Sequence, residues 1–335
     1  MSTTLPVVRI HKLTSIDAFV VFDLDGASTA TGSVRAGDKI LASTATELAR
    51  CTTYAYASLG IEKCGASAGI NAPEASRAEA IVKFVAEIEK LVVDGVFLPD
   101  HNRVVTADDL ASLRPHDPRI AIDDDALIAR AGLDVLDALG LEMADGRAAI
   151  EGFAPSSLPL VELLAQQDAR IVAVGTAVGT ATNSAGFDAG ELSQLMTSHG
   201  DDCVNDLGGE VLPANRIYGV DADVFFVGSR LGALNDRSAP FVRARTIVPT
   251  APSPITAKAF AILQRSNVTV VPDFVVMAAP LAAAWQAGDP TAAVAGIVHE
   301  IVDEDEGLYL AACHRAEGFM RTWRDHLPFG RPLAG

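Results

Sequence analysis

The sequence predicts an α/β protein of two domains, the second built on a doubly wound parallel sheet. Three observations point to this class. The chain has 335 residues, enough for two domains that each bury a core. Its second half alternates apolar, strand-like runs with helix-like segments, which is the pattern of parallel βαβ units. Residues 146–188 follow the order strand, turn, helix, strand that is typical of a nucleotide-binding unit.

The first half predicts a smaller α/β domain. Its clearest element is an amphipathic helix over Pro73–Val93, because Ile81, Phe84 and Ile88 recur at helical spacing. Asp25-Gly26 marks a turn after an apolar run. The other elements expected in this half are a strand over 17–23, a helix over 45–57, a loop or strand over 65–71, and a loop and strand over 95–106.

The second half predicts the larger sheet. A helix over Asp123–Leu139 is expected to connect the domains, and the acids at its start favour a helix N-terminus over a metal site. We expect domain boundaries at 1–122, 123–273 and 274–335, with the last helices returning to the first domain. The expected elements are strands over 147–151, 170–174, 223–227, 244–248 and 268–271, helices over 156–167, 188–198, 234–240 and 256–265, and a helical, alanine-rich tail.

Charge, apolar runs and cysteine spacing disfavour several classes of partner and location. The formal net charge is −17, which disfavours nucleic acid and anionic membrane surfaces as partners. The longest apolar runs are too short to span a bilayer, and the first fifteen residues do not resemble a signal peptide. Four scattered cysteines lack the spacing of metal ligands, so we expect a reduced, cytoplasmic protein without a metal site.

The turn after residues 147–151 departs from a dinucleotide-binding turn. Such a turn uses three glycines, and only Gly152 is present here, with Ala154 and Ser157 at the other two positions. Pro155 removes a backbone N–H that could face a phosphate. Thr176 follows the next strand, where an acidic residue would hold a ribose hydroxyl. We therefore expect NAD(P) binding to be weak or absent.

Four sequence words resemble the glutamate/leucine/phenylalanine/valine dehydrogenase family. The family's LAKGMTYKNALAGLPFGGAKGGI is similar, without a gap, to Leu48–Ile70, and GKTVAVQGF is similar to 146–153. The words AKIIVEGANGPTT and VLVVPDILANAGG resemble 244–256 and 268–280. Because the words keep the family's order over nearly the whole chain, the resemblance implies a two-domain amino-acid-dehydrogenase-like fold with a Rossmann-like second domain. It also implies a cleft between the domains that holds a small metabolite, and a homo-oligomer.

The resemblance places the family's two functional lysines on uncharged residues. The lysine that grips the substrate carboxylate corresponds to Ala55, and the lysine that activates water or the imine corresponds to Ser67. Neither side chain offers an ammonium group for acid–base chemistry. Lys63 is a candidate substitute, although it lies four residues before Ser67.

Other candidate residues follow from the same words. The family's catalytic aspartate corresponds to Asp109 or to Asp100, and both residues also suit a cap or turn. Cys64 is a candidate nucleophile with His101 as its base, the alternative being a small buried cysteine. The resemblance implies a substrate pocket formed by Arg35, Tyr54, Ala55, Tyr56 and Met277, and it places Pro252 in the turn that faces the nicotinamide.

These observations leave three functional hypotheses. The first is a repurposed, non-redox enzyme that acts on a small amino-acid-like metabolite. The second is a non-catalytic pseudo-dehydrogenase that binds a small molecule or a partner subunit. The third is an NAD(P)-dependent amino acid dehydrogenase with an altered site. Fold alone does not decide between them.

Overall fold

The computed structural model describes residues 8–102, 104–119, 121–328 and 331–334. The chain divides into two compact units. The first consists of Met1–Ile122 and Cys313–Pro332, and the second of Asp123–Ala312 and Leu333–Gly335.

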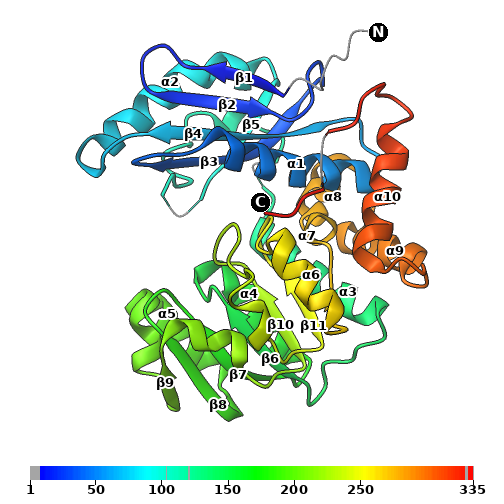
Figure 1. The fold of residues 1–335 in the computed structure, drawn as a ribbon. Coiled ribbons are helices and arrows are strands. Elements are labelled where there is room, and N and C mark those ends of the chain that lie inside the picture. Colours follow the sequence, from blue (N-terminus) through cyan, green and yellow to red (C-terminus); the bar gives the residue numbers. More distant parts are fainter. Residues whose placement is uncertain (1–7, 103, 120, 329–330, 335) are drawn as a thin grey trace. The chain divides into compact units, whose positions relative to one another are not determined.

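The first unit is built on a mixed five-stranded sheet with the order β1-β2-β4-β3-β5 (Figure 1). Strands β3, β4 and β5 run parallel, and β2 pairs antiparallel with both β1 and β4. The segment over 65–71, which the sequence leaves as loop or strand, lies within β4. The elements are β1 (Arg9–Lys12), β2 (Ala18–Phe22), β3 (Ala30–Gly37), α1 (Ala42–Ser58), β4 (Cys64–Asn71), α2 (Arg77–Val93) and β5 (Phe97–Asp100).

Each face of this sheet has its own apolar core. Val20, Val34 and Ala68 belong to a cluster with Phe84 and Ile88 of α2. On the other face, Phe19 and Val21 of β2 pack with Ala45 of α1. This alternation follows from the two-residue period of a strand, and it confirms the predicted amphipathic helix.

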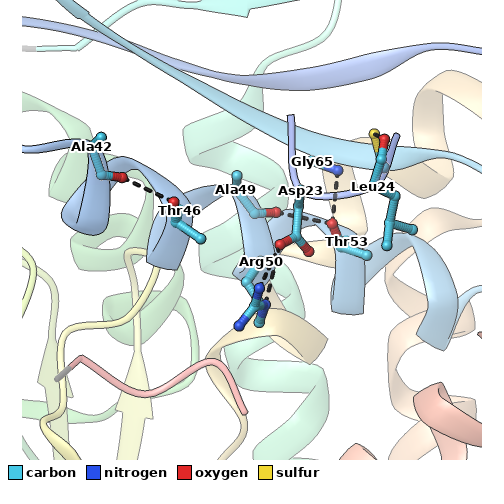
Figure 2. A network of polar contacts seen from close by, with 9 residues as sticks. Asp23, Leu24, Ala42, Thr46, Ala49, Arg50, Thr53 and Gly65 are labelled. Carbon is cyan, nitrogen blue, oxygen red and sulfur yellow. Dashed lines mark hydrogen bonds and ion pairs between the residues drawn. The ribbon is translucent and has the colours of Figure 1, made fainter. Parts of the chain in front are cut away.

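Helix α1 lies directly on β4 because Gly65 has no side chain. A Cβ atom at Gly65 would come within 1.8 Å of the Ala49 carbonyl oxygen. The Gly65 N–H donates to Thr53 Oγ1 at 3.0 Å, and the Thr53 hydroxyl donates to Ala49 O (Figure 2). The glycine therefore fixes how closely helix and strand approach.

A buried ion pair joins the end of β2 to the same helix. Arg50 Nη2 lies 2.9 Å from Asp23 Oδ1, and the Asp23 side chain is fully buried (Figure 2). Burial raises the pKa of Asp23, and the Arg50 charge opposes that rise. The pair holds β2 and α1 together at the point where both approach the start of β4.

The second unit is built on one mainly parallel seven-stranded sheet with the order β12-β11-β10-β6-β7-β8-β9. The five strands from β12 to β7 are parallel, as predicted, whereas β8 pairs antiparallel with β7 and β9. The strands are β6 (Arg147–Glu151), β7 (Arg170–Gly175), β8 (Thr180–Phe187), β9 (Glu210–Leu212), β10 (Val224–Val227), β11 (Thr246–Pro249) and β12 (Thr269–Val270).

Helices accompany these strands (Figure 1). Helix α3 begins after Asp123, whose carboxylate accepts the Ala126 N–H as an N-cap, so the acidic run starts a helix as expected. The division of the chain between Ala312 and Cys313 falls within helix α10. The helices are α3 (Asp124–Ala138), α4 (Leu158–Gln166), α5 (Ala189–His199), α6 (Ala257–Arg265), α7 (Asp273–Val276), α8 (Ala278–Trp285), α9 (Pro290–Ile301) and α10 (Leu308–Met320).

Two sequence expectations for the second unit are wrong. Residues 234–240 do not form the expected α-helix, because Leu234 makes a parallel bridge to Ile255 and the Asn235 side chain accepts the Arg237 N–H in a turn. Only a short 3₁₀ helix follows, at Ala239–Phe241. Strands β8 and β9 lie in a region for which no strand was expected. Their presence makes the β9 edge of the sheet antiparallel.

Within the described ranges, no helix combines the length and the apolar character that crossing a membrane requires.

We predict that Arg50→Ala strongly destabilises the protein, because it leaves a buried carboxylate without its partner. Loss of one partner from a buried pair costs about 3–5 kcal/mol. Denaturant unfolding at pH 7 measures the change. The pKa of Asp23 is already raised in the folded state, and it rises further in the variant. The folded state therefore binds a proton at Asp23 more tightly than the unfolded state does. The variant's loss of unfolding free energy, relative to the wild type, accordingly becomes smaller as the pH falls toward 4.

Lys90→Ala is the matched control, because Lys90 pairs with Asp94 on an exposed helix surface. The expected loss in its free energy of unfolding is below about 0.5 kcal/mol. Equal costs for the two variants would contradict a structural role for the Asp23–Arg50 pair.

Candidate functional site

The residues matched to the family's lysines are closed inside the first unit. Ala55 of α1 and Ser67 of β4 are both 0% exposed. The Ser67 hydroxyl donates to the Ser33 carbonyl oxygen across the β3–β4 pair at 3.1 Å. The resemblance implies an ammonium group at each of these two positions. The protein instead has the methyl group of Ala55 and the Ser67 hydroxyl, which is hydrogen-bonded to the neighbouring strand.

The tyrosines of the candidate pocket are bound internally. The Tyr54 hydroxyl donates to Glu317 Oε1 of α10 at 2.9 Å, and burial followed by the Glu317 charge raises the pKa of Tyr54. The Tyr56 hydroxyl lies 2.7 Å from Thr31 Oγ1 of β3, and Tyr56 is fully buried. Both rings help to hold α1 in place.

Arg35 lies on the same strand and is half-buried. Its Nη2 donates to Thr44 Oγ1 at 3.2 Å, and burial lowers the pKa of Arg35 while Glu47 opposes that shift. The buried Nε atom has no hydrogen-bond partner among the described residues. A role for Arg35 in ligand binding stays a prediction.

The two candidate aspartates make different contacts. Asp109 is exposed, and its Oδ2 accepts from both the backbone N–H and the hydroxyl of Thr106, as a turn cap does. Asp100, at the end of β5, lies 2.6 Å from Arg119 Nη1. A role for either carboxylate as a general base stays a prediction.

Sequence reasoning does not find Arg119, which joins two aspartates in a partly buried ion triad. Its guanidinium bonds Asp100 through Nη1 and Asp117 through Nε and Nη2, and its side chain is 10% exposed. Burial alone would lower the pKa of Arg119, but the two carboxylates outweigh burial and raise it. The only early signal is the turn-like Asp117-Pro118-Arg119, which says nothing of Asp100.

The structure does not bring Cys64 and His101 together. Cys64 and Phe97 are both opposite Ala30 of β3, and His101 lies four residues beyond Phe97, or roughly 13 Å along the strand direction. Cys64 is 1% exposed, and burial raises the pKa of its thiol to about 12. These are properties of a structural cysteine.

Lys63 keeps some features of a reactive residue. It is half-buried immediately before β4, and burial lowers the pKa of its amine. Buried lysines with a lowered pKa occur at catalytic sites as well as at structural ones.

In the second unit, the predicted cofactor residues lie at the carboxyl edge of the sheet. Gly152 follows β6 with φ +80°, and a Cβ atom there would lie 2.5 Å from Ser229 N, so the loop after β10 packs directly on it. Pro155 begins a short 3₁₀ turn before α4. The Ser157 hydroxyl accepts the N–H of buried Ala154 at 3.3 Å.

The remaining cofactor positions, Thr176 and Pro252, and the pocket residue Met277 lie in segments that make internal hydrogen bonds. Thr176 follows β7 as expected, but its hydroxyl donates to Asp201 O at 2.7 Å and accepts the Val178 N–H. Pro252 precedes Ser253, whose N–H donates to buried Asp273 Oδ2 at 2.6 Å. The half-buried Met277 ends α7 with its N–H on Asp273 O.

A small pocket of about 40 Å³ remains at this edge. This is far below the ~300–1,000 Å³ range of ligand sites. It contains one carboxylate, Asp125, and no lysine or arginine. The lining residues are Asp125, Ile128, Ala129, Gly152, Ser156, Ser157, Leu160, Gly228 and Thr250.

Sequence reasoning also misses Glu151, the last residue of β6. It is 8% exposed, and its Oε2 accepts the N–H groups of Gly228 and Ser229 at 3.2 and 3.0 Å. Its position at the carboxyl end of a central strand is a signal that could have found it, because ligands of open α/β sheets bind there.

No group of three or more histidine, cysteine, aspartate or glutamate side chains is arranged to hold a metal ion in the part of the chain that the structure describes.

Comparison with known proteins finds a family that resembles the second unit. The family model for glutamate/leucine/phenylalanine/valine dehydrogenase matches residues 129–279, which contain all seven strands of the second sheet. Curated relatives similar to this chain include the glutamate dehydrogenase of Thermotoga maritima, 30% identical over 149 residues, and NADP-specific glutamate dehydrogenase A1 of Halobacterium salinarum, 28% identical over 148 residues.

These sequence matches are partial. Each covers 44% of this chain, and they span 35% and 36% of the two relatives. The shared fold extends further. The hetero-hexameric glutamate dehydrogenase of Thermus thermophilus in its Leu-bound form has a TM-score of 0.76 at 20% identity, with 92% of this chain and 86% of that chain covered. L-tryptophan dehydrogenase of Nostoc punctiforme has a TM-score of 0.63 at 18% identity, with 94% and 95% covered.

We predict that the native protein does not react with iodoacetamide at Cys64 near pH 8. The thiolate is the reactive form, and a pKa of about 12 leaves almost none of it at that pH. Peptide mass spectrometry after alkylation measures the labelling. Denatured protein is the control, and there Cys64 should react fully. Rapid labelling of the native protein at Cys64 would return this residue to the list of nucleophiles.

Proposed function

We propose that this chain is a non-redox, non-catalytic protein that uses the dehydrogenase fold to bind a small amino-acid-like molecule. The observation that carries the proposal is the pair Ala55 and Ser67. Both are fully buried at the positions matched to the lysines, and the Ser67 hydroxyl is bonded to Ser33 O. Without an ammonium group at either position, the substrate carboxylate loses its anchor and the imine its acid–base group.

The contacts of the other candidates favour binding over repurposed catalysis. Asp109 serves as a cap, Asp100 is paired with Arg119, and the Cys64 thiol is buried. A repurposed non-redox enzyme is the second candidate function. Lys63 supports it, because a half-buried amine with a lowered pKa is suited to acid–base work.

We infer that NAD(P) is not a cofactor. Ala154, Ser157 and Thr176 make internal hydrogen bonds, and the exposed Pro155 has no N–H to donate. The one carboxylate of the pocket at this edge, Asp125, also disfavours a pyrophosphate.

We also propose homo-oligomeric assembly and a cytoplasmic location. The hetero-hexameric state of the Thermus relative and the four free, buried cysteines support these two proposals respectively. Light scattering should give a mass above the 35.0 kDa of one chain.

We predict no NADH or NADPH production by the purified protein with glutamate, leucine, phenylalanine or valine. Absorbance of the reduced nicotinamide measures turnover. The double variant Ala55→Lys with Ser67→Lys should also be inactive, because the cofactor positions remain unchanged. Circular dichroism verifies that the variant folds, since both positions are fully buried.

Sustained turnover by the wild-type protein would overturn the proposal. Lys63→Ala then separates the remaining explanations. If the variant abolishes that turnover, Lys63 supplies the missing ammonium group, and if it does not, another residue does.

A further inference from the structure

Glu151 occupies the place in the second sheet where a ligand would be expected. In the order β10-β6-β7, the chain passes from β6 to β7 on one side and reaches β10 on the other. Such a switch point, at the carboxyl ends of the strands, is where open α/β sheets bind ligands. Glu151 is paired there with Val227, the last residue of β10.

Donors of the β10 loop converge on this carboxylate. Oε2 accepts the two successive backbone N–H groups of Gly228 and Ser229, and Oε1 accepts the Ser229 hydroxyl. The Gly228 N–H is shared with the backbone carbonyl oxygen of Glu151, also at 3.2 Å. The Tyr218 hydroxyl lies 3.5 Å from Oε1 and donates to Ala233 O at 2.9 Å. Burial, followed by the charge of Glu151, raises the pKa of Tyr218, so it stays a neutral donor.

Successive backbone N–H groups directed at one point form an anion-binding arrangement. In this protein the anion is supplied by the chain itself. A phosphate or carboxylate ligand would have to displace Glu151 from these donors and then remain close to its negative charge. The similar family word GKTVAVQGF has glutamine at the position of Glu151, which has the same shape without the charge.

We propose that Glu151 is an internal anion that occupies an oxyanion site formed by the Gly228 and Ser229 amides, and that it thereby excludes anionic ligands from this edge of the sheet. The inference rests on the proposed absence of NAD(P) binding and names a residue that causes it. The latent site would take a phosphate-type oxyanion.

Calorimetric titration of the full chain with inorganic phosphate tests the proposal. We expect no saturable heat with the wild-type protein. Glu151→Gln removes the charge and keeps the shape. Glu151→Ala also removes the side-chain acceptor from the Ser229 amide and hydroxyl, whereas the Gly228 N–H keeps its bond to the backbone carbonyl oxygen of residue 151. Both variants should bind phosphate at least about tenfold more tightly than the wild type.

Glu162→Ala is the matched control. It removes one negative charge from an exposed position on α4 and leaves the amides of the β10 loop untouched, so it should gain no binding. If Glu151→Ala fails to fold because its donors lose their acceptor, Glu151→Gln decides the question. A folded Glu151→Gln variant that gains no phosphate binding overturns the inference. An equal gain in Glu162→Ala also overturns it, because the effect would then be one of general charge.

The outcome is separable from that of the proposed function. Turnover of an amino acid by the wild-type protein would refute the function, whatever phosphate does. Absence of turnover together with no gain in Glu151→Gln would refute only the role of Glu151.

Discussion

The carboxylate of Glu151 is the contact on which the chemistry of the second unit depends. It joins the end of β6 to the loop after β10, and that loop packs on Gly152 so closely that no side chain would fit there. A parallel sheet directs the ends of its strands to one edge and leaves loop amides there without partners. Here those amides are satisfied from within the chain, so the edge is structurally complete without a ligand.

The first unit shows the same principle with different groups. Arg119 is a buried cation, but Asp100 and Asp117 neutralise it. Arg50 is likewise paired with Asp23, and the Ser67 hydroxyl is bonded to the neighbouring strand. Polar groups that could act on a ligand instead stabilise the packing of α1 and the sheet. These contacts support the proposed non-catalytic role, since a fold does not fix the function it carries.

Much of the fold could be predicted from the sequence because buried parallel strands are continuous apolar runs. Ala148–Ile150 and Val224–Val227 have no polar residue to confuse the pattern. Strand β8 could not be found in this way, because it contains Asn183, Ser184 and Gly186 and is partly exposed. The helix expected over 234–240 failed because a local side-chain turn at Asn235 competes with helix formation.

The residue types at the candidate site can be read from the sequence, but their contacts cannot. Ungapped similarity assigns Ala55 and Ser67 to the family's lysine positions, and this assignment stays a prediction. Ion pairs depend on segments that meet only after folding, such as Asp100 with Arg119, 19 residues apart, and Asp23 with Arg50, 27 residues apart. The role of Glu151 cannot be read from the sequence, because its partners lie 77 and 78 residues away.

Calorimetric titration of the wild-type protein with NAD and with NADP tests the central claim most directly, because it requires no knowledge of a substrate. The account predicts no saturable binding of either dinucleotide, since the amides and hydroxyls at the carboxyl edge of the second sheet are already bonded. A dissociation constant in the low micromolar range, about −8 kcal/mol, would contradict it. Such a result would mean that the internal contacts of Glu151, Ser157 and Thr176 give way to the cofactor.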